Sequence, residues 1–364
     1  MQLLLLLLSC TIIAPIAFAS RQPWQLIAPD PLGNVRLLAD CLYNKNDLGD
    51  DCIPAYCQPS VTVHQGDGVW LPRAPFAGTQ WVTALHRELF QEFSAWSFNF
   101  LEIAATAGAA KGFTEVLGFF HWQANNTGSY HGLDPTDRQS ADYGVMHLTA
   151  DKQGKVTDVT IWRAGFMEER EVLLLAAEYQ DTIGPIRDIT QQPFWMPSQS
   201  LQLKMITHAH TLIEVLNQGD KFLDSLDDIA VDSVVLLDGM HIWGPAKAAG
   251  LTALKLWVAD WLQQYELTVA ITASAATPTS NKVFLCFKML LTQGSSATQV
   301  NGCLIYVFNI QGFITHIVVY RNGTPKEMAE KFIGGSTMAG PDWHGPLPKE
   351  MPSWQLQRSA EGIR

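Results

Sequence analysis

Histidine and carboxylate side chains on predicted strands are the groups in this chain with the clearest potential for acid–base chemistry. His121 and His147 fall on neighbouring strand-like runs, and Asp158 falls on the run that closes the first half of the chain. A histidine in an apolar pocket can titrate near neutral pH, and desolvation can raise the pKa of a carboxyl group toward the same range. We therefore take His121, Asp158 and His147 as candidate catalytic residues. Each could instead be a half-exposed strand residue without a chemical role.

Further side chains are expected to line a pocket beside these groups. Alternation along residues 156–164 places Val156, Asp158, Trp162 and Ala164 on one face of a strand. The same alternation along residues 314–322 places every second residue, beginning with residue 314, on one face of a strand later in the chain. The residues that we expect to line a pocket are His64, Trp70, Trp162, Trp243, His316, Tyr320 and Asn322. Trp70 and Trp243 could equally be core anchors that bury a large apolar area.

Sequence motifs for metals, nucleotides and nucleophilic catalysis are not found. His208 and His210 are two residues apart on a predicted helix and so project to different sides, unlike ligands at i and i+4. Cys52 and Cys57 have the spacing of neither a redox pair nor a zinc site. No P-loop, dinucleotide fingerprint or Ser-His-Asp order is present. We expect no metal and no cofactor.

Length and composition describe a globular protein of about two domains. The chain has 364 residues, of which 47% are hydrophobic and 16% charged, enough for two separate cores. Its net charge of −11 disfavours a nucleic-acid partner, because such a partner calls for a basic surface to neutralise phosphates.

The elements that must position these residues are clearest between residues 201 and 332. A helical stripe carries Met205, Ala209, Leu212 and Leu216, and Gly219 marks the end of that helix. A short apolar strand and a second helix follow, and then four strand-like runs. Helices followed by strands predict an α+β fold with an antiparallel sheet curled around the helices.

Four segments of this stretch are similar in order and spacing to the SnoaL-like branch of the NTF2-like (cystatin-cone) superfamily. They are LNQGD, DSVVLLDG, GPAKAAGLTALKLWVADWLQQY and QGFITHIVVYRNGT. Earlier in the chain, TGSYHGLDPTDR resembles a loop of the polyketide cyclases in this family. The resemblance implies a curved antiparallel sheet wrapped on about three helices, with a pocket inside that binds an apolar ring or polyketide. It also implies a single Asp near the end of the last strand as general base.

The upstream half of the chain reads as a second copy of the same unit. PSVTVHQGDGVW at 59–70 matches DSVVLLDGMHIW at 232–243, and Gly144 matches Gly302. We therefore expect two tandem domains of this kind. The predicted organisation is a signal peptide at 1–19, a linker at 20–31, a first SnoaL-like domain at 32–179, a linker at 180–200, a second SnoaL-like domain at 201–333 and a Gly/Pro-rich tail at 334–364.

The first 19 residues are apolar and end in Ala-Phe-Ala before Ser20, which is typical of a cleaved signal peptide. We therefore expect a secreted protein with no membrane association after cleavage. The segment around the cleavage site also resembles the bipartite plastid presequences of algae, so a plastid location is the alternative.

Six cysteines are consistent with an oxidising compartment. Cys41, Cys52 and Cys57 lie close together in the sequence, and a disulfide within this group is expected in a secreted chain. Cys286 and Cys303 lie on consecutive strand-like runs, where they could form a cross-strand bridge or remain two small buried thiols.

The catalytic Asp that the family resemblance implies is missing. Its place is taken by Ala164 in the first half and Asn322 in the second, and Asn126 stands where the cyclases carry a His. Three functions stay open: a metal-free SnoaL-like cyclase, isomerase or hydratase acting on a small apolar or polyketide-like molecule; a non-catalytic module that binds such a molecule or serves as a scaffold; and an iota-type carbonic anhydrase. The two domains could cover each other as an intramolecular pseudo-dimer, so we expect a monomer, and sedimentation as a tetramer of domains would contradict this.

Overall fold

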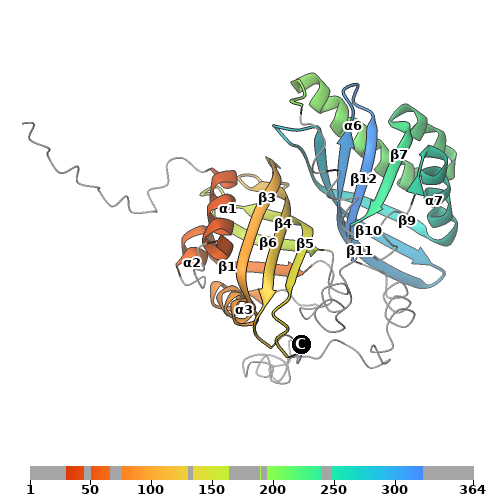
Figure 1. Cartoon of the computed structure of the whole chain (residues 1–364). Helices are drawn as coiled ribbons and strands as arrows, with labels where there is room; N and C mark the ends of the chain where they lie inside the picture. The colour runs from red at the N-terminus through yellow and green to blue at the C-terminus, as the bar shows by residue number, and fades with distance from the viewer. Residues whose placement is uncertain are drawn as a thin grey trace, which may run out of the picture.

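The computed structural model describes residues 30–44, 51–65, 76–129, 134–163, 189, 195–239 and 248–322. These residues form two six-stranded sheets, each accompanied by helices (Figure 1). We call residues 30–163 the first half and residues 195–322 the second half. The mixed α+β fold predicted from the sequence is confirmed. Residues 1–19, the tail, Ala164, Trp70, Trp243 and most of the linker at 180–200 lie outside the described residues.

The first half begins with helices and closes with long strands. Its elements are α1 (Pro31–Ala39), the π-helical turn η1 (Asp40–Asn44), α2 (Cys52–Tyr56), β1 (Cys57–Gln65), β2 (Phe76–Ala77), α3 (Thr79–Glu92), β3 (Phe93–Ala107), β4 (Thr114–Asn126), β5 (Gln139–Ala150) and β6 (Val156–Arg163). The strand order in the sheet is β2-β1-β6-β5-β4-β3. Asp30 caps α1 by accepting a hydrogen bond from the Gly33 amide.

The second half has the same succession of elements. They are α6 (Gln199–Gln218), the 3-10 segment η2 (Asp220–Asp228), β7 (Ala230–Asp238), β8 (Ala248–Ala249), α7 (Leu251–Gln264), β9 (Glu266–Ala276), β10 (Lys282–Gln293), β11 (Ser296–Phe308) and β12 (Ile314–Arg321). The strand order is β8-β7-β12-β11-β10-β9. Helix α6 ends at Gly219, whose φ of 85° favours glycine, as the sequence predicts. No helix in the described part of the chain is long and apolar enough to cross a membrane.

Each sheet contains one parallel pair, so the prediction of a wholly antiparallel sheet is wrong. β1 pairs with β6 in parallel, and β7 pairs with β12 in parallel, while the other pairs are antiparallel. A parallel pair needs a long crossover between its two strands. The helix and the meander of three strands between β1 and β6 supply that crossover.

Positions matched between the halves from sequence alone occupy equivalent places in the two sheets. Gly144 pairs with Arg163, and Gly302 pairs with Arg321. Helices α3 and α7 each have 14 residues and each follows a two-residue strand. A Cβ at Gly144 would overlap the ring of Phe120, just as a Cβ at Gly302 would crowd the ring of Phe287.

Each sheet has one face covered by its own helices and a second face directed toward the other sheet. On the helix face, the core of the first half joins α1, α2 and α3 to the sheet, and the core of the second half joins α6 and α7 to the sheet. The second faces share a third core, which contains Phe119 and Trp162 from the first half and Cys303 and Tyr320 from the second. Figure 1 accordingly shows α1 and α2 on one side, α7 on the opposite side and the sheets between them. We call the second faces the shared face.

Two disulfides tie neighbouring elements together. Cys41 of η1 is joined to Cys52 of α2, as expected for the N-terminal group, and Cys57 remains a buried free thiol. Cys286 and Cys303 are directly opposite each other on β10 and β11 and are joined as well. The second disulfide lies in the shared core, where both residues are at most 1% exposed.

A buried ion pair crosses the shared face. The Lys282 ammonium group lies 3.0 Å from a carboxylate oxygen of Glu102, and the two side chains are only 2% and 6% exposed. Removing one partner of a buried pair leaves the other charge desolvated without compensation. The pair therefore favours the one alignment of the two sheets in which both charges meet.

Lys282→Met should lower the free energy of unfolding by about 3 kcal/mol, because it leaves Glu102 buried without its cation. The double variant Glu102→Leu/Lys282→Met should recover most of this loss, since it buries no charge. Urea unfolding of the three proteins measures both effects. A cost below about 1 kcal/mol for the single variant would show that the pair is solvated in the protein.

Candidate functional site

In β6 and β12, the last strand of each half in the sequence, the side chains alternate between the two faces of the sheet in a different way from the prediction. The pairing of β6 with β5 shifts between Val156 and Asp158, and Val156 packs in the helix-face core together with Val159. A one-residue bulge moves the following side chains to the opposite face. Asp158 and Trp162 therefore lie on the shared face, and the prediction that they share a face with Val156 is wrong. In β12 the pairing shifts at the equivalent place, after Ile314.

The shared face of the first half carries a row of histidine and carboxylate side chains across four adjacent strands. On β1 and β6, a His64 ring nitrogen (Nε2) lies 3.2 Å from an Asp158 carboxylate oxygen, and the Thr62 hydroxyl donates to the same carboxylate. The side chains of His64 and Asp158 are 40% and 39% exposed. This end of the row is open to solvent.

The row continues on β5 and β4. A His147 ring nitrogen (Nε2) lies 2.8 Å from a Glu115 carboxylate oxygen, and the Thr149 hydroxyl donates to that oxygen at 2.8 Å. These side chains are less exposed, at 18% for His147 and 13% for Glu115. We call His64, Asp158, His147 and Glu115, with Thr62 and Thr149, the polar row.

Hydrogen bonding keeps both carboxylates of the polar row ionised. Burial by itself would raise the pKa of Asp158, but hydrogen bonds from His64 and Thr62 outweigh it and the pKa is lowered. Burial likewise opposes hydrogen bonds from His147 and Thr149 at Glu115, whose pKa is also lowered. Neither carboxylate therefore has the raised pKa expected of a general base in an apolar pocket.

The other predicted residues lie in separate places. His121 stands opposite Tyr143, with ring centroids 4.8 Å apart, four residues along β5 from His147. Burial lowers the pKa of His316, whose ring contacts the Thr315 hydroxyl. Asn322 accepts a hydrogen bond from the Asn301 amide. Trp162 and Tyr320 belong to the shared core, so they do not line the helix faces where we expected a pocket.

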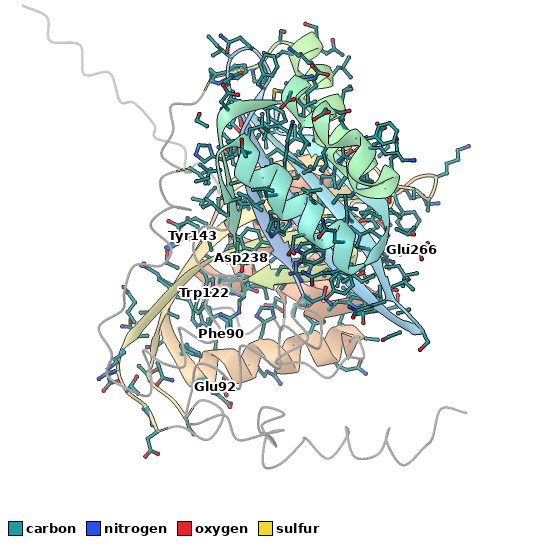
Figure 2. All side chains as sticks on the ribbon, turned by 90° about the vertical axis from the view of Figure 1, so that its right-hand side faces the viewer. Phe90, Glu92, Trp122, Tyr143, Asp238 and Glu266 are labelled. Atoms are coloured by element: carbon teal, nitrogen blue, oxygen red, sulfur yellow. A yellow bond between two sulfur atoms is a disulfide. The ribbon has the colours of Figure 1, made fainter. Side chains whose placement is uncertain are left out.

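The helix face of the first half holds an aromatic cluster that the sequence reasoning missed. Tyr43 of η1 stacks on Phe98 with ring centroids 4.6 Å apart and contacts Trp96 at 5.9 Å. Trp96 in turn lies 5.3 Å from Trp122 of β4. His86 of α3 meets the edge of Tyr43 at 5.2 Å. Phe90, in the last turn of α3, lies 5.6 Å from Trp96, and Figure 2 labels both Phe90 and Trp122.

An arginine completes this cluster. The guanidinium carbon of Arg163, at the end of β6, lies 4.9 Å from the centroid of the Trp122 ring. Its charge is also close enough to Tyr43 to lower the pKa of the phenol in part. A guanidinium over an indole face is an attractive cation–π contact. We call His86, Tyr43, Trp96, Phe98, Trp122 and Arg163 the interior cluster.

Burial keeps the two titratable rings of the interior cluster neutral. Desolvation raises the pKa of Tyr43 to about 12, against a smaller opposing effect of Arg163. Desolvation lowers the pKa of His86 to about 4. At neutral pH, Tyr43 is therefore a phenol and His86 a neutral imidazole.

Two nitrogens of the interior cluster have no hydrogen-bond partner among the described residues. They are Trp122 Nε1 and His86 Nδ1. Trp122 is 5% exposed and His86 is 6% exposed. A buried polar atom without a hydrogen-bond partner costs about 1–3 kcal/mol, so such atoms call for an explanation. A bound molecule with polar atoms would supply what the protein leaves out. Trp162 Nε1, on the shared face, is also without a partner in the described part.

The equivalent positions of the second half are apolar. Val258 has the same position in α7 as His86 has in α3. Met289 of β10 corresponds to Trp122 of β4, because each lies two residues after the phenylalanine that pairs with the matched glycine. Both are buried, at 0% and 6% exposed. Arg321 alone is retained, over the ring of Trp261 at 4.9 Å, and it is 2% exposed. The histidine and the indole nitrogen of the interior cluster are thus particular to the first half.

Local structure accounts for the position of each member of the cluster. Val82, His86 and Phe90 are four residues apart and lie on one stripe of α3. Tyr43 lies on a π-helical turn held to α2 by the Cys41–Cys52 disulfide. π-helical turns are rare and frequent at functional sites. The stripe on α3 was a signal available in the sequence, whereas the π-helical turn was not.

Metal ligation finds no support in the described residues. No group of three or more His, Cys, Asp or Glu side chains in that part of the chain could hold an ion. His208 and His210 diverge as predicted: His208 lies beside Phe313, and His210 bonds to Ser274 at 2.9 Å.

Comparison with known proteins finds similarity at the level of solved structures. No family model matches the chain. No curated protein matches it either. An LEH-like epoxide hydrolase from M. tuberculosis is 14% identical, with a TM-score of 0.29 over 36% of this chain and 98% of its own.

Two structures described as putative SnoaL-like polyketide cyclases are also similar. The one from Jannaschia sp. CCS1 is 13% identical, with a TM-score of 0.30 over 40% of this chain and 95% of its own. The one from Shewanella putrefaciens CN-32 is 14% identical, with a TM-score of 0.31 over 41% of this chain and 98% of its own. The resemblance seen in the sequence motifs is therefore met among solved structures, and at these scores it carries no argument about activity.

The burial of His86 predicts a pH dependence of stability. Its pKa in the folded chain, about 4, is below its ordinary value of 6.5, so the unfolded chain binds more protons between these two values. The free energy of unfolding should therefore fall by about 2 kcal/mol between pH 7 and pH 5 on account of this residue. His86→Gln should remove that part of the slope in urea unfolding at the two pH values. An identical slope in both proteins would mean that His86 is protonated or exposed in the folded chain.

Proposed function

We propose that the first half binds a small aromatic or apolar molecule against the interior cluster, inside a sheet that curves around its helices as a cone. The observation that carries this proposal is the pair of unpartnered buried nitrogens, His86 Nδ1 and Trp122 Nε1, within one group of aromatic rings. Ligand sites are mostly apolar, with a few converging polar groups that fix orientation. The interior cluster has this composition.

Partial exposure at one side of the cluster supports access from solvent. Trp122, His86 and Phe98 are buried, whereas Tyr43, Trp96 and Arg163 are only partly buried. A ligand entering past Tyr43 would meet apolar rings first and the two nitrogens last. The binding of a ring between aromatic side chains would add apolar burial and offset stacking.

The second half serves as a scaffold in this proposal. Val258 and Met289 replace the histidine and tryptophan of the first half, and the shared core attaches the second sheet to the first. With the shared face already covered inside one chain, we also propose a monomer. Secretion through residues 1–19, with a plastid as the alternative, remains a prediction from the sequence.

A neutral polarity-sensitive probe, N-phenyl-1-naphthylamine, should bind the full chain with a fluorescence increase. Trp122→Leu and Tyr43→Leu should each weaken its binding at least fivefold, because each removes a ring that packs in the interior cluster. Trp261→Leu in the second half is the matched control and should change affinity less than twofold.

Two outcomes would count against the site. Equal binding by all variants would place the probe elsewhere, and a loss confined to Trp261→Leu would move the site to the second half. Circular dichroism at the titration temperature verifies that each variant is folded. Because Tyr43 is partly exposed, its substitution keeps the test valid if Trp122→Leu unfolds.

Acid–base catalysis at the polar row is a second candidate function. The observation that favours it is the pairing of His64 with Asp158 and of His147 with Glu115, with hydroxyl groups on both carboxylates. A carboxylate that accepts a hydrogen bond from one imidazole nitrogen orients the ring, so that its other nitrogen can take part in proton transfer. This candidate does not need the Asp that is absent at position 164.

Under this second candidate, His147→Ala and Asp158→Asn should each lower turnover of the chain's substrate by about 100-fold or more. Melting temperature should change little, because both residues are partly exposed. His210→Ala in the second half, which loses the hydrogen bond to Ser274, is the matched histidine control. Wild-type rates in both variants of the polar row would exclude it from catalysis.

A further inference from the structure

We propose that Asn125, near the end of β4, is a site of N-linked glycosylation. Residues 125–127 read Asn-Asn-Thr, which is the acceptor sequence for an N-linked glycan in a secreted protein. Such a glycan requires secretion through residues 1–19, which belongs to the proposed function, but it does not require a ligand in the interior cluster.

The side chain of Asn125 lies on the shared-face side of its sheet. Phe120 and Trp122 of β4 belong to the helix-face core of the first half, whereas Leu117 and Phe119 belong to the shared core. This strand pairs with β5 without a shift in register, so its side chains alternate between the two faces. Asn125 follows the alternation of Leu117 and Phe119 and therefore points away from the helices.

The second sheet does not cover this end of β4. Leu117 and Phe119 are 0% and 2% exposed, but the next three side chains on the same face are only partly buried. They are those of His121, Gln123 and Asn125. On this strand the shared core therefore ends at Phe119, and Asn125 lies beyond it.

The strands on either side of Asn125 leave space for a large group. Asn125 stands opposite Ser94 of β3 and opposite Gln139 of β5, and both of these residues are exposed. Within the described part of the chain, the side-chain amide of Asn125 makes no hydrogen bond. A glycan on its side-chain nitrogen would therefore displace no polar contact of the described fold.

The other two residues of the acceptor sequence have separate roles. Asn126 is 1% exposed; its Nδ2 donates to the Gly128 carbonyl oxygen at 2.9 Å, and its Oδ1 accepts from the Thr136 amide at 3.0 Å. Asn126 thus holds the turn that follows β4. Thr127, whose hydroxyl group the acceptor sequence requires, is exposed. The turn therefore keeps both Asn125 and Thr127 accessible while the residue between them is buried.

Two further observations agree with a secretory route. The described residues contain two disulfides, which are typical of secreted proteins. A second acceptor sequence begins at Asn322, whose Oδ1 accepts a hydrogen bond from the Asn301 amide at 2.6 Å. The two residues after Asn322 lie outside the described part of the chain, so the assignment concerns Asn125.

The test uses the full chain, made in a eukaryotic cell line and collected from the medium. Peptide-N-glycosidase F in heavy-oxygen water replaces a glycan-bearing Asn by an isotopically labelled aspartate, so peptide mass spectrometry reports each site separately. Most copies of the peptide that contains position 125 should carry this label. Thr127→Ala should abolish it, and Thr127→Ser should keep it. Asn99→Gln, an exposed position on β3 outside any acceptor sequence, is the matched control and should also keep it.

The contrary results are distinct from one another. A secreted chain that lacks residues 1–19 and has an unmodified Asn125 overturns the inference and leaves secretion standing. A chain retained in the cell with residues 1–19 attached overturns both. A label that persists in Thr127→Ala also contradicts the inference, because the modification would then not depend on the acceptor sequence. The wild-type result stands even if a variant does not fold, and binding of the neutral probe tests the interior cluster separately.

Discussion

Burial of one sheet by the other is the constraint on which the arrangement of this chain depends. Each sheet has a helix face with its own core, and the remaining two faces close on each other over aromatic, aliphatic and disulfide-linked side chains. Charged side chains on the shared face must then be paired or lie at its margin. Lys282 and Glu102 are paired, and the polar row lies where β6 passes from the buried Trp162 to the half-exposed Asp158.

The same constraint separates two kinds of chemistry in the first half. Histidines that face carboxylates lie on the shared face, and a histidine that faces aromatic rings lies on the helix face. The bulges at the start of β6 and β12 make this separation, because a shift of one residue exchanges the two faces of a strand. Arg163, adjacent to Trp162 in sequence, consequently lies on the opposite face, over Trp122.

Much of the fold could be predicted from the sequence because its signals are local. The stripe of α6, the glycine that ends it and the apolar runs that became β9 to β12 are periodic patterns within one element. The matching of Gly144 with Gly302 held because both positions lack room for a Cβ beside a phenylalanine. The bulges and the parallel pairs could not be predicted, since they depend on partner strands that are distant in sequence.

The candidate site was harder to predict for the same reason. His64, His147 and Asp158 were chosen for their residue types, and the structure does bring them into one row, but on the shared face. His86 was missed because a single histidine on an apolar helix stripe resembles a core residue. Its contact with Tyr43 depends on the π-helical turn, which no local pattern indicated.

The duplicated architecture allows one half to be specialised while the other supports it. The two sheets have equal strand order, and both retain an arginine beside a tryptophan. Only in the first half, within the described residues, do a histidine and a tryptophan with unpartnered nitrogens accompany that arginine. Specialisation of this kind requires few substitutions, because the backbone framework is already present.

The central claim is that Trp122 Nε1 faces a ligand, and indole N–H signals in a ¹H–¹⁵N NMR spectrum test it most directly. Trp162 Nε1 is equally buried and without a partner in the described residues, but it lies on the shared face, so it is an internal control. Addition of N-phenyl-1-naphthylamine should shift the Trp122 signal, identified by its loss in Trp122→Phe, and leave the Trp162 signal in place. A stationary Trp122 signal at saturating ligand would contradict the account.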